Sequence, residues 1–500
     1  MRKLVLATFF LFGYLIFRPI LSDVWYPVHD TTAITRVYLL ENSLSDAGFP
    51  AIWASDLNNG QGYPLFHFYA PLITYLALVG KTLTSSYFMG VKAVLFLTSV
   101  LGMVGMYLLT RHRGRLSALL SSIAFALLPY AAVNIYVRGA YAEYLAMSLL
   151  PWVFYYWRDL SSVHRRLLAA LATSLFILSH NLIPLITAPF LLVWILIHHH
   201  FNFRLLVLPI ITTLLLSSFY LFPLLFERHF VMADSVARTT DYAKHFVAPT
   251  QLWNSLWGFG GSGEGTPDGM SFKIGKMHLL LASIATLFII IKQKLRELFW
   301  VISLVVALFM TTAYSAFIWQ SIPFLPIVQF PWRYLALVGF LASVLAGYFL
   351  TIIKNKYLQL FAFFFLLFTL LVLNLKLFVP QTAFPADLSI YTSESYLSTL
   401  PSIVPEYRPV WLDMQNPIMS DTELLPYTYY PTWQVKVDGK RVNTYPGADG
   451  ELAFSNPTHS RDVVAKQSHT KLENISTLIS LITLLTLLLY YFLPKLYVKN

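Results

Sequence analysis

The chain has 500 residues, of which 57% are hydrophobic and only 12% are charged. Soluble proteins carry about 25% charged residues, so this composition cannot cover a water-facing surface and indicates an integral membrane protein. The net charge of +11 does not point to nucleic acid, because no basic stretch forms a solvated face or tail. The absence of cysteine excludes disulfides, zinc–cysteine sites and cysteine catalysis.

Apolar runs of about 17 to 25 residues mark membrane-spanning helices. The sequence predicts a polytopic α-helical protein with twelve spans, near 4–21, 88–109, 116–133, 140–157, 166–180, 182–197, 205–223, 277–291, 298–317, 334–353, 357–378 and 475–493. The first run is interpreted as a retained helix, because no small-residue cleavage site follows it. The apolar segment 68–80 is short, and it fits either a further span or a helix lying on the membrane surface.

The distribution of Lys and Arg decides between these alternatives, because cytoplasmic loops are enriched in both. With 68–80 on the surface and the N-terminus inside, every short basic loop falls on the cytoplasmic side. If 68–80 crossed the membrane, all later loops would be inverted. The sequence therefore predicts a multi-pass protein of the cell membrane with both termini in the cytoplasm.

Three long segments then face the outside: 22–87, 224–276 and 379–474. In the last one, Trp433–Val437 alternates apolar and polar residues, and Asp438-Gly439 is a favoured hairpin turn. We expect a small external β-sandwich-like domain over about 386–470, which either acts as a stabilising lid or positions a glycan acceptor. The predicted domains are thus a transmembrane domain at 1–378, the β-rich domain at 379–474, and a final helix with a short tail at 475–500.

The first external segment is rich in polar and aromatic residues. Thr31 and Thr32 can start an amphipathic helix that runs to Ala47, which leaves Asp30 just before a helix N-terminus and at the mouth of the first span. There its carboxylate is expected to be ionised and to face the external interface. A second acid, Asp56, lies in a Ser-Asp-Leu-Asn-Asn-Gly stretch that is typical of a solvated turn.

Short motifs spread from residue 29 to residue 439 carry a family resemblance. They are His29-Asp30, Phe49-Pro50-x-x-Trp53, Gly62-Tyr63-Pro64-Leu-Phe, Arg138-Gly-Ala-Tyr-Ala-Glu143, Phe330-Pro-Trp-Arg333 and Tyr430-Pro-x-Trp433 followed by Val437-Asp-Gly439. In order and placement the chain resembles the GT-C superfamily of membrane glycosyltransferases. It is more similar still to the bacterial membrane proteins known as "6-pyruvoyl-tetrahydropterin synthase-related" and to YfhO-type proteins. Nothing in the sequence supports pterin chemistry.

The resemblance implies a reaction and its partners. In GT-C enzymes, a carboxylate of the first external loop activates an acceptor hydroxyl, which attacks the sugar of a polyprenyl-phosphate donor, and the configuration inverts. Asp30 matches that carboxylate, and a general base must indeed be ionised and reach the acceptor proton. The expected partners are the polyprenyl-phosphate sugar, membrane lipid and an envelope glycan or lipid acceptor, with no nucleic acid. The cofactor is unknown, and Mg²⁺ or Mn²⁺ is left open.

Basic residues at the outer helix ends are the candidates for the donor phosphate, and each has a plainer interpretation. Arg138 could instead form a structural ion pair with Glu143, and Arg333 could anchor a helix at the interface. His180 stands where the polymyxin-resistance branch of the GT-C enzymes has a basic residue near the phosphate, but the lysine is replaced by histidine. Arg228 could belong to a solvated helix end. The predicted supporting residues are His29, Glu143, Tyr63, Asn181 and Glu227.

Two other patterns are interpreted without a ligand. The glycine run that begins at Gly258 is not a Walker A loop, because no Gly-Lys-Ser/Thr follows it, and we expect a lid over the site. His198–His200 lies at a cytoplasmic helix end with no nearby acid, so no metal site is predicted there.

Two other functions compete with the glycosyltransferase. A transporter or flippase of lipid-linked glycans would place ionisable groups or broken helices near the bilayer midplane, whereas here Lys92 is the main ionisable residue inside an apolar run. A non-catalytic envelope scaffold with the same fold is the other alternative.

Overall fold

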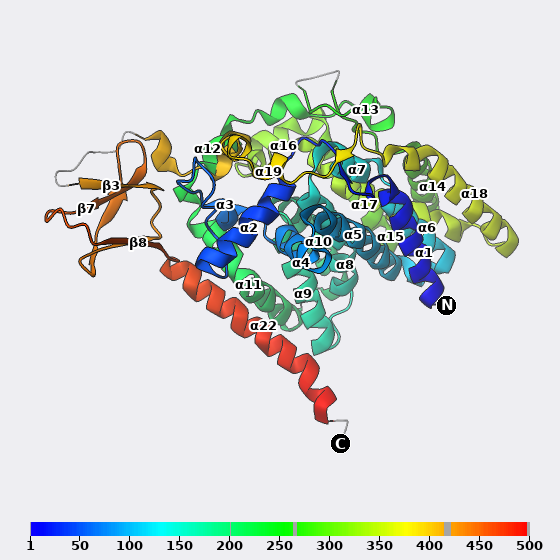
Figure 1. Cartoon of the computed structure of the whole chain (residues 1–500). Helices are drawn as coiled ribbons and strands as arrows, with labels where there is room; N and C mark the ends of the chain where they lie inside the picture. The colour runs from blue at the N-terminus through cyan, green and yellow to red at the C-terminus, as the bar shows by residue number, and fades with distance from the viewer. Residues whose placement is uncertain (1, 201, 264–267, 415–421, 498–500) are drawn as a thin grey trace. The chain divides into compact units, whose positions relative to one another are not determined.

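The computed structural model describes residues 2–200, 202–263, 268–414 and 422–497 (Figure 1). Within these residues the chain forms two compact units. Unit 1 comprises Met1–Ala33, Val79–Pro209 and Thr240–Ala386, and unit 2 comprises Ile34–Leu78, Ile210–Thr239 and Asp387–Asn500. Each unit thus combines segments that are distant in the sequence, and each is described by itself.

Unit 1 is built mainly of long helices. In chain order they are α1 (Arg2–Phe17), α5 (Tyr87–Thr110), α6 (Arg115–Ala126), α7 (Pro129–Val133), α8 (Tyr141–Trp157), α9 (Val163–Ser179), α10 (Leu182–His199), α13 (Pro249–Trp253), α14 (Lys276–Ile291), α15 (Leu295–Thr311), α16 (Ala316–Ser321), α17 (Leu335–Phe349) and α18 (Lys356–Asn374). The two short strands β1 (Val24–Trp25) and β2 (Phe384–Pro385) pair antiparallel.

Helix α17 lies at the centre of unit 1, with α6, α14 and α15 packed around it. All of its residues from Leu335 to Tyr348 are buried, which explains why this segment is apolar on every side. Small residues permit the close approach to α6. The Ser117 hydroxyl donates a hydrogen bond of 2.8 Å to the Gly347 carbonyl of the facing helix.

Helices occupy all twelve places where the sequence predicts a span. Eight helices of the described part are long and apolar enough to cross a membrane, or nine if α15 and α16, which meet at a bend of 92°, form one span. Helices α8, α9 and α14 have 16 or 17 residues, so the count of twelve stays a prediction. Helix α4 (Leu72–Thr84) has only 13 residues, which suits the predicted surface helix.

Unit 2 contains helices and two small sheets. Its helices are α2 (Ala33–Ala47), α3 (Leu65–Phe68), α12 (Ala233–Thr239), α19 (Ser389–Thr392), α20 (Glu394–Leu397), α21 (Leu400–Ile403) and α22 (Lys471–Tyr497). Helices α4 and α11 (Phe203–Phe226) contain boundaries between the units. The predicted amphipathic helix in the first external loop is therefore present as α2.

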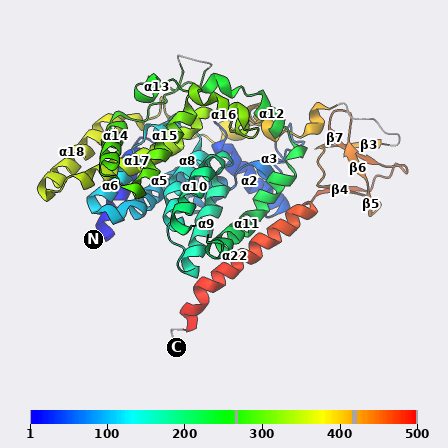
Figure 2. The same ribbon diagram turned by 180° about the vertical axis from the view of Figure 1, so that it is seen from behind.

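The β-structure of unit 2 consists of two three-stranded sheets, drawn in orange to red tones in Figures 1 and 2. One sheet has the order β3-β7-β6 and the other β5-β4-β8. The strands are β3 (Thr422–Thr428), β4 (Trp433–Val437), β5 (Lys440–Val442), β6 (Thr444–Pro446), β7 (Glu451–Ser455) and β8 (Val463–Gln467). All pairings are antiparallel.

The two sheets share one hydrophobic core, to which β4 contributes Val435 and Val437 and β7 contributes Leu452 and Phe454. The predicted β-rich region and its hairpin at Asp438-Gly439 are confirmed. Within the described residues its strands begin only at Thr422, because 389–403 forms the short helices α19 to α21, and the expected domain boundary near 386 stays a prediction. The Ser393 side chain accepts the Tyr396 N–H and so favours a helix start there over a strand.

Candidate active site

A π-helical turn in unit 1 positions Arg138. Residues Asn134–Arg138 form this turn, which ends at Gly139 in the left-handed conformation with a φ of +70°. The Arg138 Nη1 group donates hydrogen bonds to Asn134 Oδ1 at 2.6 Å and to the Tyr130 hydroxyl at 3.2 Å. π-Helical turns are rare and occur frequently at functional sites.

Glu143, in the first turn of α8, is the acid at the centre of the cluster. Its Oε2 lies 3.0 Å from Arg138 Nη1, 3.9 Å from Arg333 Nε and 4.0 Å from His180 Nε2. The Tyr130 hydroxyl donates a short hydrogen bond to Oε1. The side chain is only 1% exposed. A carboxylate at this depth needs positive partners, and two arginines supply them.

The contacts of His180 define its protonation state. Its Nδ1 accepts the backbone N–H groups of Leu182 at 3.0 Å and Ile183 at 3.1 Å, and so caps the first turn of α10. Because Nδ1 acts as an acceptor, the ring is neutral and carries its proton on Nε2, the atom that faces Glu143. The neighbouring Asn181 precedes α10 at its N-cap position.

Arg333 reaches the cluster from the short helix Pro331–Tyr334. Its Nη1 donates to the Val328 carbonyl, in a short hydrogen bond, and to Gln329 Oε1 at 3.2 Å. The Trp332 ring lies against both arginines, with its centre 4.4 Å from the guanidinium carbon of Arg138 and 5.8 Å from that of Arg333. These contacts fix both guanidinium groups before any ligand binds.

Asp30 lies beside Arg138. The backbone N–H groups of His29 and Asp30 donate to the carbonyls of Val137 at 3.0 Å and Arg138 at 2.8 Å, and the charges of Asp30 and Arg138 attract each other. The Asp30 Oδ1 accepts the Thr32 N–H at 3.1 Å and the Thr32 hydroxyl. The carboxylate is thus oriented by its own loop and remains half-buried.

Glu143 is more deeply buried than its three basic neighbours. The side chains of Arg138, His180 and Arg333 keep 13%, 15% and 12% of their surface accessible, against 1% for Glu143. The accessible face formed by Arg138, His180 and Arg333 is therefore basic and rich in N–H donors, and Glu143 lies underneath. Such an arrangement can receive an anion without exposing it to the buried carboxylate.

The glycine segment packs beside this cluster. The His29 Nε2 lies 3.0 Å from the Phe259 carbonyl oxygen. The Gly260 N–H donates to the Gly269 carbonyl at 2.9 Å, and the Gly269 N–H donates to the Gly261 carbonyl at 3.0 Å. A Cβ atom on Gly260 would lie only 2.9 Å from the Gly269 Cα, so a larger residue would clash with the backbone there. Residues 264–267 of the expected lid lie outside the described residues, and its function as a lid stays a prediction.

Three predicted site residues belong to unit 2 and have other contacts there. The buried Tyr63 hydroxyl donates to the Val404 carbonyl at 2.9 Å. Arg228 pairs with Asp234 at 3.5 Å, and both side chains are nearly half exposed. Glu227 lies beside His67. The structure thus brings Asp30, Arg138, Glu143, His180 and Arg333 together in unit 1. The roles of all ten predicted residues, including His29 and Asn181, stay predictions.

Sequence reasoning missed Tyr130, Asn134 and Trp332. The spacing of Asn134 and Arg138, four residues apart, was a signal that could have placed them on one helix face. Trp332 adjoins a predicted arginine, but only the fold shows that its ring also contacts Arg138. Tyr130 had no local signal, since it reaches Glu143 across a break between two helices.

Comparisons with known proteins complete the description. A search of curated proteins gave no match. Among solved structures, the arabinofuranosyltransferase AftD from Mycobacteria matches with a TM-score of 0.49 and 18% identity, over 77% of this chain and 28% of that one. A mutant of the same protein matches with a TM-score of 0.46 and 15% identity, over 77% and 29%. The chain thus spans less than a third of the AftD chains that it matches.

The sequence also matches the family described as "6-pyruvoyl-tetrahydropterin synthase related domain; membrane protein" over residues 66–380. This match covers more than half of the chain and includes Arg138, Glu143, His180 and Arg333. It confirms the resemblance expected from the motifs. The chain therefore belongs to the 6-pyruvoyl-tetrahydropterin synthase-related family of membrane proteins.

Proposed function

We propose that this protein is a membrane glycosyltransferase of the GT-C type. It would transfer a sugar from a polyprenyl-phosphate donor to an acceptor hydroxyl on the outer face of the membrane, with inversion. The observation that carries the proposal is the partly accessible basic face formed by Arg138, His180 and Arg333, next to the carboxylate Asp30.

The two arginines suit the phosphate of the donor. When the bond between the sugar C1 and the phosphate oxygen breaks, the phosphate leaves with the electron pair and gains negative charge. Fixed positive charges and N–H donors stabilise such a leaving group most when they are oriented beforehand. Arg138 and Arg333 meet this condition because Glu143 and the Trp332 ring hold them, and the His180 Nε2–H adds a neutral donor.

Asp30 suits the role of general base. The attacking acceptor oxygen forms the new bond to C1 and loses its proton, which Asp30 would accept. The adjacent Arg138 favours the ionised carboxylate, and Thr32 orients one of its oxygens. Asp30 and Glu143 are the acids of this cluster, and Glu143 already pairs with both arginines. The expected Mg²⁺ or Mn²⁺ therefore stays a prediction, and no step is routed through it.

The proposal includes an orientation and partners. Both termini would lie in the cytoplasm. The cluster of Asp30 with the two arginines and the β-rich region would lie outside, where an envelope glycan or lipid acceptor is available. The alternative of a transporter is disfavoured by Lys92. Its Nζ donates a hydrogen bond of 2.9 Å to the Ser22 carbonyl. Lys92 lies in the second turn of the 24-residue helix α5 and not at the middle of that helix.

Replacement of Asp30 by Asn tests the proposal. In a strain that lacks the gene, wild type and Asp30→Asn would be expressed at equal levels and the sugar content of the envelope compared. We expect Asp30→Asn to reduce the transfer by about 10²–10⁴-fold. Asp56→Asn, whose carboxylate accepts a hydrogen bond from Asn42 at 2.8 Å, is the control and should keep activity.

The same experiment separates the alternatives. A scaffold needs no base, so a scaffold carrying Asp30→Asn would restore the envelope as well as the wild type does. That result would make the catalytic assignment wrong.

A further inference from the structure

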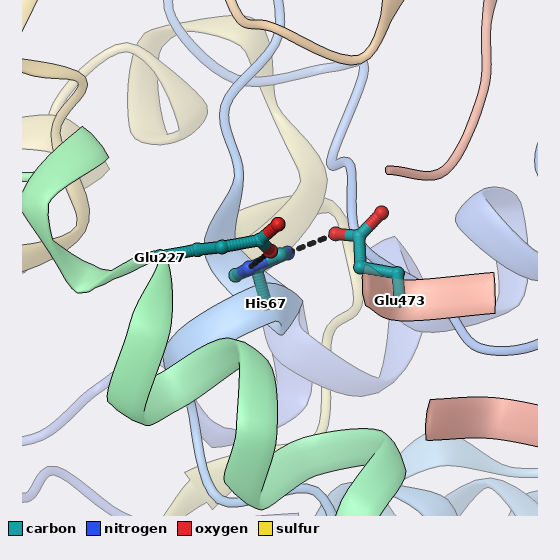
Figure 3. A group of neighbouring side chains, drawn as sticks. All are labelled: His67, Glu227 and Glu473. Carbon is teal, nitrogen blue, oxygen red and sulfur yellow. Dashed lines mark ion pairs between the residues drawn. The ribbon is translucent and has the colours of Figure 1, made fainter. Parts of the chain in front are cut away.

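A second buried group of ionisable side chains lies in unit 2. His67 of α3, Glu227 at the end of α11 and Glu473 at the start of α22 offer one ligand atom each, and these atoms lie within 4.8 Å of one another. The His67 Nε2 is 3.0 Å from Glu227 Oε2, and its Nδ1 is 2.6 Å from Glu473 Oε1. Figure 3 shows the imidazole ring between the two carboxylates.

Burial makes the repulsion between the two carboxylates of this group costly. The side chains of His67 and Glu473 are 1% and 2% exposed, and that of Glu227 is 9% exposed. Two carboxylates so close together repel each other unless a positive charge lies between them.

Thr470 orients both carboxylates toward one point. Its hydroxyl donates to Glu227 Oε1 at 2.7 Å and its backbone N–H donates to Glu473 Oε2 at 2.5 Å. The remaining oxygens, Glu227 Oε2 and Glu473 Oε1, and the His67 Nε2 have no aligned hydrogen-bond partner within the part of the chain that the structure describes. Each of the three residues thus directs one atom into the group.

Tyr430 supplies an independent indication of a ligand. Its side chain is fully buried, and its hydroxyl has no hydrogen-bond partner among the described residues. The hydroxyl is close enough to interact electrostatically with both Glu473 and Glu227, and its ring centre is 6.0 Å from that of His67. A buried hydroxyl without a partner is costly, and a bound ion or its water would satisfy it.

There is room for such a water. A cavity of about 20 Å³ is lined by His67 and Glu473, together with Pro50, Tyr75 and Tyr220. A water molecule needs about 10–15 Å³ measured in this way. One position beside His67 and Glu473 can therefore be filled by solvent.

We propose that His67, Glu227 and Glu473 bind a divalent transition-metal ion. One imidazole and two carboxylates suit Zn²⁺ or Mn²⁺, and a double positive charge neutralises the two acids when His67 is neutral. The ion would fasten together the first external loop, the end of α11 and the start of α22, which are far apart in the sequence. This inference does not depend on the proposed transferase activity.

Metal analysis of the full-length protein in detergent tests the proposal. Purified without chelator, the wild type is expected to retain about one equivalent of metal per chain. A chelator should lower its melting temperature, and Zn²⁺ or Mn²⁺ alone should restore it. The conservative variants Glu227→Gln and Glu473→Gln should bind these ions at least about tenfold more weakly.

The chain provides a matched control. His459 and Glu423 form a His–Glu pair at 3.4 Å in the same unit, but their side chains are 75% and 38% exposed. Glu423→Gln should keep the metal and its effect on the melting temperature.

Two results would overturn the proposal. One is a wild-type protein whose melting temperature responds neither to chelator nor to either ion, which is what a proton shared by His67 and the two acids predicts. The other is an unchanged metal content in both cluster variants. If these variants do not fold, the change in the melting temperature of the wild type with chelator and with added ion is the deciding test of the metal site.

Discussion

Glu143 is the buried carboxylate that pairs with two arginines, Arg138 and Arg333. Its carboxylate lies 3.0 Å from Arg138 and 3.9 Å from Arg333, at 1% exposure. A buried ion pair adds little stability compared with apolar residues, but loss of one partner leaves an uncompensated charge. Glu143 therefore has a structural role in addition to any contact with a substrate.

This dependence predicts the effect of Glu143→Gln. The substitution keeps the shape but removes the charge, so both guanidinium groups lose their counter-ion, and we expect a loss of about 3–5 kcal/mol in the free energy of unfolding. Thermal unfolding in detergent measures it. Asp159→Asn breaks a pair with Arg165 in which both side chains are 42% exposed, and it should cost less than about 1 kcal/mol. Equal effects of the two variants would contradict the structural role.

Gly139 determines how closely the Asp30 segment approaches Arg138. Its φ is +70°, and a Cβ atom there would lie 2.7 Å from Val28 Cγ2 and 2.8 Å from the Asp30 carbonyl oxygen. Only glycine satisfies both the backbone conformation and the space.

Gly139→Ala should therefore displace Asp30 and reduce the proposed transfer. It should also cost about 1–2 kcal/mol in stability, because alanine is strained in the left-handed conformation. Gly60→Ala is the matched control, because Gly60 has a φ of +81° but nothing within 4 Å of the added atom. Envelope sugar content and thermal unfolding should both be measured. If Gly139→Ala and Gly60→Ala behave alike in both assays, the close approach has no functional importance.

At the scale of elements, the contact between α6 and α17 depends on Gly347. A Cβ atom at this position would lie 1.9 Å from Ser121 Oγ and 2.4 Å from the Ser117 carbonyl oxygen. A side chain can rotate away, but the backbone carbonyl of a helix cannot move without shifting the helix. The two helices approach this closely only because the residue is glycine.

Gly347→Ala should thus separate α6 from α17, with a loss of at least about 1–3 kcal/mol in the free energy of unfolding. Gly13→Ala on α1 is the comparison, since the nearest atom to its new methyl group would be the Phe96 ring at 3.0 Å, which can adjust. Thermal unfolding compares the two. A smaller effect at Gly347 than at Gly13 would show that the helices of unit 1 adapt more easily than this packing implies.

At the scale of the whole molecule, the predicted orientation in the membrane is open to test because the sequence contains no cysteine. Single cysteines can be introduced without a competing thiol. Ser161→Cys lies in a predicted cytoplasmic loop and Lys440→Cys in the β-rich region, and both positions are exposed. We expect a membrane-impermeant maleimide to label position 440 in intact cells and position 161 only after permeabilisation. The reverse pattern would invert the proposed topology.

The sequence by itself determined the membrane class, the places of the long apolar helices, the β-rich region and the family. These properties follow from local composition and periodicity, because a lipid-facing helix needs a long apolar run and a strand alternates its faces. The start of α2 and the turn at Asp438-Gly439 were predictable for the same reason. The helices α19 to α21 were not, since short capped turns leave only a weak signal in the sequence.

Only the tertiary structure decided which charged residues meet. Arg138 and Glu143 are neighbours in the sequence, but Arg333 and Trp332 join them from almost 200 residues away. His67, Glu227 and Glu473 are spread along most of the chain and form one buried group. Each of these residues alone reads as an ordinary polar residue at a helix end. Their chemistry arises when folding removes them from water together, because burial makes opposite charges depend on each other and makes like charges require a counter-ion.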